Sequence, residues 1–397
     1  MEPDDHRAIA KKLDLFHFQE EAPGMVFWHP RGFSMFRELE EANRRYVRAQ
    51  GYVEVRSPQL IRQPVWERSG HWQHFKENMF VLEEDEGRAA ALKPVSCPGH
   101  LEIASRMSLS YRDLPLRFAE LGVCHRNEQS GALSGLFRLR QFVQDDGHVL
   151  CDPDDVVDEV ARFCASLSPF YRAFGFESIQ VSLAGRPESR FGEEAIWDKA
   201  EAALADAARE AGLDFDFVPG GGAFYGPKLE IALVDSSKRQ WQCGTVQVDY
   251  FLPGRFGVQY AARDGSRRAP AMLHRALYGS LERFLGIVIE HHRGRMPAWL
   301  SPEQVRVVPL RSSEHEHAIS LARELRDRGM RVGIDDGSEG ISKRVALAHA
   351  SEVPFVAVLG PREIAAASAD LRSREGRDVL PRGELVARLA AAVAPPW

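Results

Sequence analysis

The sequence is short of cysteine and of long apolar runs, and both shortages narrow the classes of protein to which it can belong. Its five cysteines are an odd number in 397 residues, are widely spaced and include no Cys-x-x-Cys pair. A disulfide framework is therefore excluded, and a reducing cytoplasm is favoured. No apolar run approaches the roughly 18 residues that a membrane-spanning helix requires, so we expect no membrane partner. The first residues, Met1-Glu-Pro-Asp-Asp-His6, are acidic with no apolar stretch behind them, unlike a signal or transit peptide.

The sequence also lacks a strong charge of either sign. Lys and Arg number 51 against 57 Asp and Glu, which gives a net charge of −6. This balance argues against wholesale coating of nucleic acid but allows a local basic patch. Hydrophobic residues make up 44% of the chain, a composition typical of a core-forming protein with room for two or three domains. We therefore expect a cytoplasmic enzyme.

The clearest domain boundary is the proline-containing segment 296–302. Before it, the apolar positions of residues 271–292 have the spacing of a helix with a buried face. After it, short strand and helix patterns alternate. Strands are expected at 305–310, 330–334, 355–359 and from Leu371, and helices from Ser312 or Ser313 to Arg328, at 341–350 and at 383–394. The alternation predicts a small α/β domain over 301–397, built on a mostly parallel sheet.

Residues 1–300 show a different pattern, in which several strands are neighbours in the sequence. Helices are expected at 35–50, 99–109, 154–174 and 196–211, and strands at 52–56, 116–124, 142–150, 178–183, 229–234 and 239–250. Short turns such as 235–238 join some of these strands. This pattern favours an antiparallel sheet flanked by helices, an α+β arrangement.

The densest polar sequence lies between two expected strands, at residues 124–148. Strand, charged loop and strand would project Arg126, Glu128 and Arg138 from one sheet face. Arginines suit a polyanionic substrate, because the guanidinium group binds phosphate oxygens in a bidentate fork. Surface salt bridges are the alternative interpretation. Arg283, in Gly279-Ser-Leu-Glu-Arg283, adds a further cation.

These residues resemble the signature motifs of class II aminoacyl-tRNA synthetases. Arg126-Asn-Glu128 with Arg138 and Phe142 is similar to motif 2, Gly279-Ser-Leu-Glu-Arg-Phe284 to motif 3, and Pro58 to the motif 1 proline at the dimer interface. Three stretches resemble the threonyl-tRNA synthetase family: Lys93-Pro-Val-Ser-Cys-Pro-Gly-His100, Phe224-Tyr-Gly-Pro-Lys228 and Trp241-Gln-Cys-Gly-Thr-Val-Gln247. The resemblance runs from about residue 5 to the end. It implies a class II catalytic domain over 1–300, an anticodon-binding-type domain over 301–397, and a homodimer.

The resemblance also implies one zinc ion per subunit, held by Cys97, His148 and His274. Three protein ligands with an open fourth position are typical of a working zinc, and sulfur and nitrogen donors suit zinc better than magnesium or calcium. The ligands are 51 and 126 residues apart, so their spacing alone does not reveal a site. In the family the zinc binds the amino group and hydroxyl of threonine. Residues matching the family's amino-acid site are Gln144, Asp146, Tyr225 and Gln247, with Asp146 accepting the hydroxyl's hydrogen bond.

The implied reaction joins threonine to AMP from ATP, with Mg²⁺ on the phosphates, and then passes the threonyl group to tRNA. Arg126 would bind the α-phosphate and Arg283 the γ-phosphate, and His71 would lie near the transfer step. The other implied ATP contacts are Glu128, Arg138, Phe142, Gln242 and Thr245, with Phe142 stacked on adenine. No covalent protein nucleophile is needed, so catalysis would consist of positioning and charge stabilisation.

Two departures from the family shape our expectations. Bacterial members carry a ubiquitin-like domain and an editing domain before the core, whereas this chain begins almost at the core. We therefore expect serine activation without editing of seryl-tRNA, because one methyl group supplies only about 1–3 kcal/mol of discrimination. Ser351-Glu352 stands where relatives have Arg-Arg before Val-Pro. A carboxylate there would repel RNA phosphate, which weakens the implied anticodon recognition.

Three functional hypotheses follow from the sequence. The first is a zinc-dependent threonine–tRNA ligase without editing. The second is a paralogue that adenylates threonine or a related hydroxy amino acid for a carrier, a small molecule or a specialised tRNA. The third is a catalytically silent sensor of amino acid or tRNA. Intact Arg126, Glu128 and Arg283, together with the three zinc ligands, count against this last hypothesis.

Overall fold

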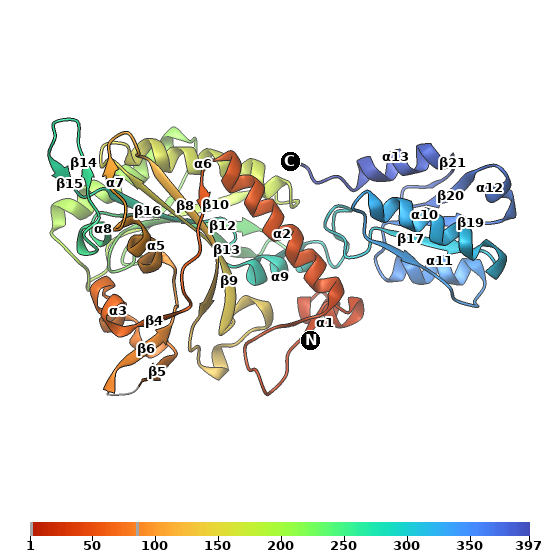
Figure 1. The fold of residues 1–397 in the computed structure, drawn as a ribbon, viewed down its shortest axis with the longest axis horizontal. Helices are drawn as coiled ribbons and strands as arrows, with labels where there is room; N and C mark the ends of the chain where they lie inside the picture. The colour runs from red at the N-terminus through yellow and green to blue at the C-terminus, as the bar shows by residue number, and fades with distance from the viewer. Residues whose placement is uncertain (1–2, 85–86) are drawn as a thin grey trace. The chain divides into compact units, whose positions relative to one another are not determined.

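The computed structural model describes residues 3–84 and 87–397 (Figure 1). The comparison with signal and transit peptides used the first six residues of the chain. Two of these, Met1 and Glu2, lie outside the described residues. The chain separates into two compact units. One comprises Met1–His17, Phe27–Glu38 and Val288–Trp397, and the other comprises Phe18–Val26 and Leu39–Ile287. The expected domain boundary near residue 300 stays a prediction. Within the described ranges, no helix combines the length and apolar character needed to cross a bilayer.

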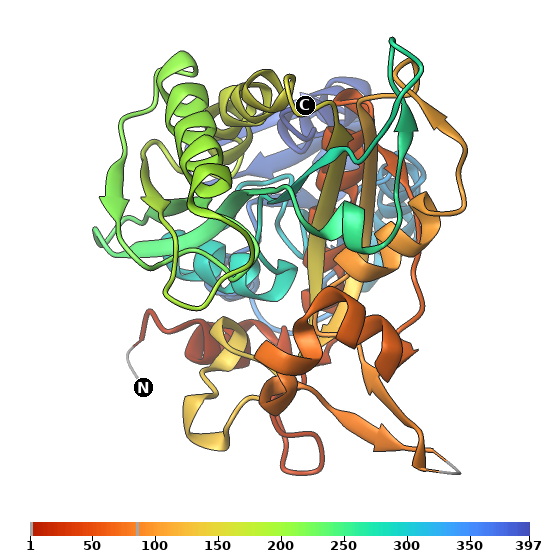
Figure 2. The same ribbon diagram turned by 90° about the vertical axis from the view of Figure 1, so that its left-hand side faces the viewer.

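An eight-stranded sheet forms the centre of the second unit, in the order β11-β10-β12-β13-β16-β9-β8-β3. Its strands are β3 (Val53–Glu54), β8 (Leu116–His125), β9 (Gln141–Cys151), β10 (Ile179–Ala184), β11 (Asp216–Val218), β12 (Lys228–Val234), β13 (Gln240–Asp249) and β16 (Ala271–Ala276). All neighbours are antiparallel except the two edge pairs, β10 with β11 and β3 with β8. Figure 2 shows β8 and β9 running side by side in this sheet. The predicted antiparallel α+β architecture is confirmed.

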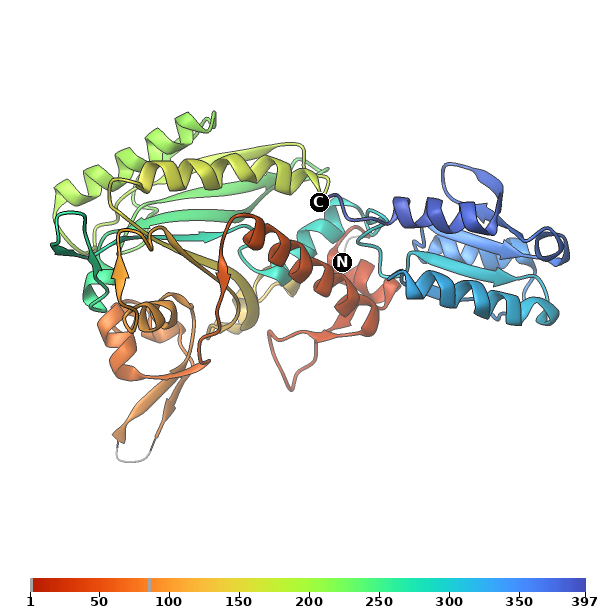
Figure 3. The same ribbon diagram turned by 45° about the horizontal axis from the view of Figure 1, so that its top comes forward.

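Two long helices, α6 (Val156–Arg172) and α7 (Glu194–Glu210), lie along one face of this sheet (Figure 3). Their apolar faces bury large side chains such as Phe163, Leu167 and Trp197 against the strands. The shorter helices of the unit are α3 (Gln63–Ser69), α4 (His71–His74), α5 (Cys97–Ala104) and α8 (Leu252–Arg255). With α6 and α7 on one face, the other face of the central strands is left for the polar residues that the sequence singles out.

Two small sheets flank the large one. The first has the order β4-β6-β5 and contains β4 (Leu60–Arg62), β5 (Val81–Glu83) and β6 (Ala89–Leu92). The second has the order β15-β14-β7 and contains β7 (Leu109–Ser110), β14 (Tyr260–Ala261) and β15 (Arg267–Arg268). Short 3₁₀ helices of this unit span Lys76–Asn78, Ser130–Ala132 and Gly135–Phe137. The last two lie in the loop between β8 and β9.

The expected single helix over 271–292 is wrong. Its first part is strand β16, and helix α9 spans only Leu281–His291. Every residue of β16 is buried. The strand is central in the sheet, between β13 and β9, and helices α6 and α8 pack against it. A strand buried on both faces does not alternate, so apolar spacing cannot distinguish it from a helix. Between the two elements Gly279 has a φ of +76°, and a Cβ there would lie 2.8 Å from the Cys243 carbonyl oxygen.

The C-terminal part of the first unit is a five-stranded sheet in the order β18-β17-β19-β20-β21. Its elements are β17 (Val305–Pro309), a 3₁₀ turn (Ser312–Glu314), α10 (His315–Asp327), β18 (Val332–Ile334), α11 (Ile341–Ala350), β19 (Phe355–Leu359), α12 (Pro361–Ala365), β20 (Ser368–Arg372), β21 (Arg377–Pro381) and α13 (Arg382–Ala392). The small α/β arrangement is confirmed. The sheet is not mostly parallel, however: β17 is parallel to β18 and β19, but β20 is antiparallel to both β19 and β21. The strand expected from Leu371 begins earlier, at Ser368.

The N-terminal segments of the first unit are α1 (His6–Leu13), β1 (Phe16–His17) and β2 (Phe27–Trp28), and β1 pairs with β2. They were not expected from the sequence pattern. Helix α2 (Pro30–Ala49) begins five residues before the expected start at 35. Pro30 is its first residue, a position where proline's missing N–H costs nothing and its fixed φ suits the helix.

Candidate functional site

The predicted site residues lie mainly on one face of the three central strands. Alternate side chains of a strand share a face, so Gln144, Asp146 and His148 of β9 point the same way. His148 pairs with His274 of β16, and His274 pairs with Gln247 of β13. The register therefore places three predicted residues in one row across neighbouring strands.

Cys97, His148 and His274 form a compact group, called here the metal-ligand cluster. Their ligand atoms all lie within 4.8 Å of one another, and all three side chains are buried. Cys97 is the first residue of α5, and the two histidines are cross-strand partners. One thiol and two imidazoles are a donor set that favours zinc. The residues present thus fit the metal that the sequence implies.

Each histidine of the cluster is held through one ring nitrogen. His148 Nδ1 lies 2.8 Å from His100 Nδ1, and His274 Nε2 lies 3.0 Å from Asp249 Oδ2. The opposite nitrogen of each ring is therefore the one left for a metal. Burial, with the nearby charges of His100 and His274, lowers the pKa of His148 well below its usual range. The neutral imidazole favoured by this shift is the form that binds metals.

The amino-acid candidates surround this cluster. Asp146 Oδ2 is buried and has no hydrogen-bond partner among the described residues. An unpaired buried carboxylate oxygen is costly unless a ligand donates a hydrogen bond to it. The Tyr225 ring lies 5.1 Å from the His274 ring, and Gln247 Nε2 donates to the Gly226 carbonyl oxygen at 2.8 Å. Gln144 Oε1 accepts a weak hydrogen bond from the Cys124 thiol at 3.8 Å.

His71 lies close to the same pocket. It is the first residue of α4, and its ring is 6.2 Å from that of Tyr225 and 5.6 Å from that of Phe224. Its Nδ1 lies 2.9 Å from the Ser69 hydroxyl oxygen. Burial, with the charges of His274 and Arg126, lowers the pKa of His71 to about 3. The imidazole is therefore neutral near pH 7 and a weak base.

The nucleotide candidates lie in three pairs. The Arg126 guanidinium is 5.0 Å from the Phe142 ring, and Arg138 Nε is 3.0 Å from Glu128 Oε2. Arg283 Nε donates to the Gln242 carbonyl oxygen at 3.0 Å, and its Nη1 donates to the Phe137 carbonyl oxygen at 3.0 Å. Thr245 is half-buried on β13, two residues before Gln247 and so on the same face. The structure thus connects motif 3 with β13 and with the loop of motif 2.

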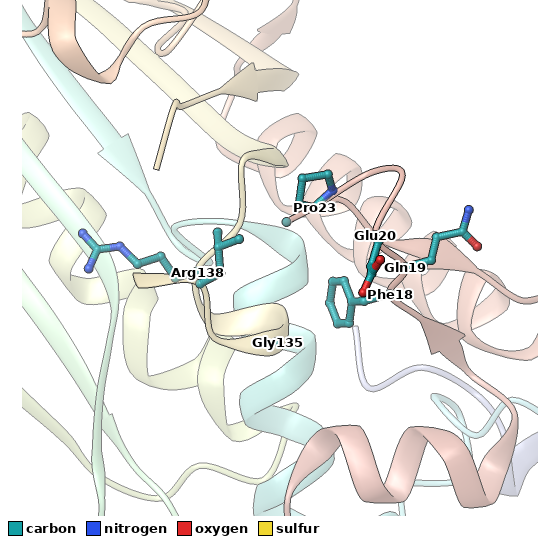
Figure 4. Close-up of a pocket in the computed structure, with 8 residues that line it drawn as sticks. Phe18, Gln19, Glu20, Pro23, Gly135 and Arg138 are labelled. Atoms are coloured by element: carbon teal, nitrogen blue, oxygen red, sulfur yellow. The ribbon is translucent and has the colours of Figure 1, made fainter. Parts of the chain in front are cut away.

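A pocket of about 350 Å³ opens beside Arg138. Its lining comes from the segment 18–26 and from the loop between β8 and β9: Phe18, Gln19, Glu20, Pro23, Gly24, Leu133, Gly135 and Arg138. Figure 4 shows Phe18 and Glu20 facing the loop that carries Gly135, with the Arg138 guanidinium directed away from Glu20. Arg138, a predicted nucleotide contact, lines this pocket, and no member of the metal-ligand cluster does so.

Glu352 does not present an isolated negative charge in the C-terminal sheet region. Its carboxylate is 3.1 Å from Lys12 Nζ and 3.8 Å from Arg295 Nε, and it also forms an ion pair with Arg374. The side chain is only 10% exposed. Three cations of the same compact unit therefore offset the charge, and the expected repulsion of RNA phosphate loses its basis.

Sequence reasoning missed the residues that support the cluster from behind. Lys93 and His100 were noticed only as part of a family stretch, and Glu120 and Asp249 were not singled out. A usable signal was present for His100, because residues three apart on a helix share a face and Cys97 begins α5. For Glu120 and Asp249 the signal depends on strand pairing, which the sequence does not display.

Comparison with known proteins agrees with this architecture. Residues 80–292 match the family model "tRNA synthetase class II core domain (G, H, P, S and T)", and residues 304–391 match "Anticodon binding domain". The threonine–tRNA ligase of Polynucleobacter asymbioticus is 49% identical over 97% of this chain and 60% of its own length. That of Teredinibacter turnerae is 49% identical over 94% of this chain and 59% of its own. The chain thus spans about three fifths of the length of the curated relatives it matches.

Solved structures give the same result. The RNA binding domain of threonyl-tRNA synthetase from Cryptosporidium parvum Iowa II superposes with a TM-score of 0.95 and 38% identity, covering 99% of both chains. A prolyl-tRNA synthetase from Giardia lamblia shares the fold at a TM-score of 0.74 and 18% identity, covering 96% of this chain and 74% of that one. The chain therefore belongs to the threonyl-tRNA synthetase family of class II aminoacyl-tRNA synthetases.

Proposed function

We propose that this protein activates L-threonine with ATP and transfers the threonyl group to tRNA(Thr), using zinc to select the amino acid. The observation that carries the proposal is the buried metal-ligand cluster beside the unpartnered oxygen of Asp146. Cys97, His148 and His274 would hold a zinc ion there, and the ion would supply coordination positions for an amine and a hydroxyl. The curated relatives named threonine–tRNA ligase support the choice of substrate.

In this proposal Asp146 recognises the hydroxyl group of threonine. Its unpartnered oxygen accepts a hydrogen bond from the threonine Oγ1–H. Valine has nearly the same shape but no hydroxyl, so it leaves the buried carboxylate unpaired. Sites built to bind a hydroxyl can reject such an analogue by about 10⁴–10⁵. Gln144, Tyr225 and Gln247 form the remaining walls of the amino-acid pocket.

The chemical steps need no covalent protein intermediate. An oxygen of the threonine carboxylate attacks the α-phosphorus of ATP, the bond between that phosphorus and the oxygen shared with the β-phosphate breaks, and pyrophosphate leaves. Mg²⁺ bound to the phosphates would neutralise part of their charge. Arg126 then stabilises charge at the α-phosphate and Arg283 at the γ-phosphate, as bidentate guanidinium groups can. Glu128, Arg138, Phe142, Gln242 and Thr245 hold the nucleotide.

The transfer step places a terminal ribose hydroxyl of tRNA on the adenylate carbonyl, and AMP leaves. The His71 ring, 6.2 Å from that of Tyr225, lies beside the proposed amino-acid pocket and is placed to contact that hydroxyl near the transfer step. The homodimer and the cytoplasmic location stay predictions. A protein with the same adenylation chemistry but another acceptor is the competing possibility.

Threonine-dependent exchange of pyrophosphate into ATP tests the activation step, and charging of total tRNA tests the acceptor. We expect wild type to exchange with threonine, to retain about one zinc per chain and to charge threonine-specific tRNA. His148→Ala should lose both zinc and exchange. Exchange without any charging of tRNA would favour the other acceptor, and full exchange without metal would contradict the proposed role of zinc.

A further inference from the structure

A continuous chain of buried hydrogen bonds lies behind His148, and the proposed reaction does not use it. His148 Nδ1 is 2.8 Å from His100 Nδ1, and His100 Nε2 is 3.0 Å from Glu120 Oε2. Lys93 Nζ donates to Glu120 Oε1 at 2.8 Å. Lys93, His100 and Glu120 are each at most 4% exposed. Four ionisable side chains therefore form one buried line that ends at the metal-ligand cluster.

The far end of this line is fixed by donors around Glu120. Ser57 donates to the carboxylate through both its N–H, at 3.1 Å, and its hydroxyl, at 2.8 Å. Burial opposes ionisation of Glu120, but hydrogen bonds from His100 and Lys93, with the charge of Lys93, hold its pKa at about 2. The carboxylate is therefore an acceptor only. His100 must donate to it through Nε2.

With a metal on His148, only one arrangement of protons fits the remaining contacts. A metal on His148 Nε2 puts the ring hydrogen on Nδ1, so His100 Nδ1 is the acceptor of that contact and His100 Nε2 donates to Glu120. His148 must then donate through Nδ1, which leaves the lone pair of its Nε2 for the cluster. The opposite tautomer of His148 would place a hydrogen on Nε2 and prevent coordination. The line therefore selects the tautomer that a metal requires.

Packing also restricts how the two rings can turn. The His100 ring is nearly perpendicular to that of His148, at 88° and 4.7 Å, and to that of Phe118, at 83° and 6.0 Å. At the far end of the line, Gly122 lies against its members, because a Cβ there would lie 3.4 Å from Lys93 Nζ and 3.5 Å from Glu120 Cδ. His274 is oriented differently, by direct contact between its Nε2 and Asp249. The two metal-facing imidazoles thus expose opposite nitrogens.

We propose that His100 and Glu120 are positioning residues that set the tautomer and ring orientation of His148 for metal binding. The inference rests on the proposed metal site. Groups that orient a metal-binding histidine typically change metal affinity about 10–100-fold when they are removed. We expect substitution of His100 to weaken metal binding by a factor of that size. Threonine binding should weaken as a result, while ATP binding should not.

The test measures zinc affinity by competition with a chelator, and the absorption spectrum of the cobalt-substituted protein, on the full chain. His100→Phe keeps a ring but removes both nitrogens, and should weaken zinc binding about 10–100-fold. His100→Asn keeps polarity but is too short to reach both neighbours, and should lose affinity similarly. His100→Gln offers an acceptor and a donor along the same line, and should recover part of the loss.

His125→Phe is the matched control, because the side chain of the buried His125, at the end of β8, is not one of the four that form this line. The hydrogen bond from its backbone N–H to the Lys93 carbonyl oxygen is kept in the variant. It should bind zinc as wild type does. Melting of each metal-free variant identifies any that fails to fold, in which case His100→Asn and His100→Gln decide the result. In steady-state exchange, the His100 variants should raise KM for threonine while leaving KM for ATP unchanged.

Wild-type zinc affinity and an unchanged cobalt spectrum in His100→Asn, and in His100→Phe where that variant folds, would overturn the inference. The proposed metal site fails separately. If wild type binds no zinc, or if His148→Ala binds it as tightly as wild type, the cluster is not a zinc site whatever His100 does.

Discussion

Consecutive residues of β9 have opposite surroundings because their side chains alternate between the faces of the sheet. Asp146 lies on the same face as His148, and its Oδ2 has no hydrogen-bond partner within residues 3–84 and 87–397. Asp145 lies on the other face and accepts hydrogen bonds from the N–H groups of Leu277, at 2.6 Å, and Tyr278, at 3.1 Å. Burial raises the pKa of Asp145 to about 7 against the opposing charge of Arg275. One carboxyl group thus holds the turn before motif 3, while its neighbour remains available for a ligand.

Asp146→Asn should weaken selection of the hydroxyl-bearing substrate. Loss of a hydrogen bond to a charged group costs about 1.5–3 kcal/mol, so kcat/KM for threonine should fall roughly 10–150-fold. The corresponding value for valine should change little, because valine makes no such bond. Pyrophosphate exchange with both amino acids measures the ratio. An unchanged threonine-to-valine ratio would remove Asp146 from substrate recognition.

Serine should be activated by the same pocket. It keeps the hydroxyl that Asp146 would bind and lacks only one methyl group, which provides about 1–3 kcal/mol, or roughly 10–200-fold in kcat/KM. Exchange assays with serine and threonine at matched concentrations measure this ratio. If kcat/KM for threonine exceeded that for serine by 10⁴ or more in the activation step, the pocket would have to recognise the methyl group through a further contact.

At the scale of single residues, the sequence predicts only part of the site. Cys97, His148 and His274 were identified through family resemblance, since intervals of 51 and 126 residues carry no spacing signal. What places them together is the pairing of His148 with His274 and the position of Cys97 at the start of α5. Glu120 was missed because its contact with His100 depends on the pairing of β8 with β9, which no local pattern reveals.

At the scale of elements, Glu282 joins helix α9 to strand β9. The pairing of β9 with β16 ends at Gly147, so Val143 lies beyond it. Both carboxyl oxygens of Glu282 lie within hydrogen-bond distance of the Val143 N–H, at 3.0 and 3.1 Å. Val143 follows Phe142, and Glu282 precedes Arg283. One buried side chain therefore holds together two elements that carry proposed nucleotide contacts.

Removal of this link should affect both stability and ATP binding. Glu282→Ala leaves the Val143 N–H unsatisfied and should lower the free energy of unfolding by about 1–3 kcal/mol. KM for ATP should rise more than KM for threonine, since Phe142 and Arg283 adjoin the link. Urea unfolding and exchange kinetics measure the two effects. Equal changes in both KM values would indicate general loosening of the fold.

The same residue predicts a pH dependence of stability. Burial raises the pKa of Glu282 to about 8, while hydrogen bonds from the Val143 and Glu282 N–H groups oppose the shift. Because the pKa is raised in the folded state, the contribution of Glu282 to the free energy of unfolding is complete below the unfolded-state pKa of about 4.5. This contribution is lost as the pH rises to about 8. Glu282→Gln should match wild type near pH 4.5 and exceed it above pH 8, by on the order of 3–5 kcal/mol. The free energy of unfolding of both proteins would be measured by urea unfolding at each pH. A difference between them that does not change with pH would contradict the raised pKa of Glu282.

The elements show where sequence patterns are sufficient. The expected helix at 341–350 and strand at 355–359 coincide with α11 and β19, since each has a clear period and clear ends. The helix expected over 271–292 was wrong, because β16 is buried on both faces and shows no alternation. The sequence also did not predict that β20 runs antiparallel to its neighbours β19 and β21. The direction of a strand depends on how the connecting segment returns the chain to the sheet, and the local residue pattern does not show this.

At the scale of the whole molecule, identity and mechanism rest on different observations. The family models and the solved relative cover the class II core and the anticodon-binding region. The proposed chemistry depends instead on a few buried contacts around one cluster. Ion pairs within one compact unit offset the charge of Glu352. Recognition of RNA by the C-terminal region stays a prediction.

Zinc removal is the most direct measurement of the central claim. Purified protein would be analysed for metal, stripped with a chelator and reloaded with zinc, with threonine-dependent pyrophosphate exchange measured at each stage. The account predicts about one zinc per chain, loss of exchange on stripping and recovery on reloading, with Cys97→Ser and His148→Ala unable to recover. Full threonine-dependent exchange by the stripped protein would contradict it.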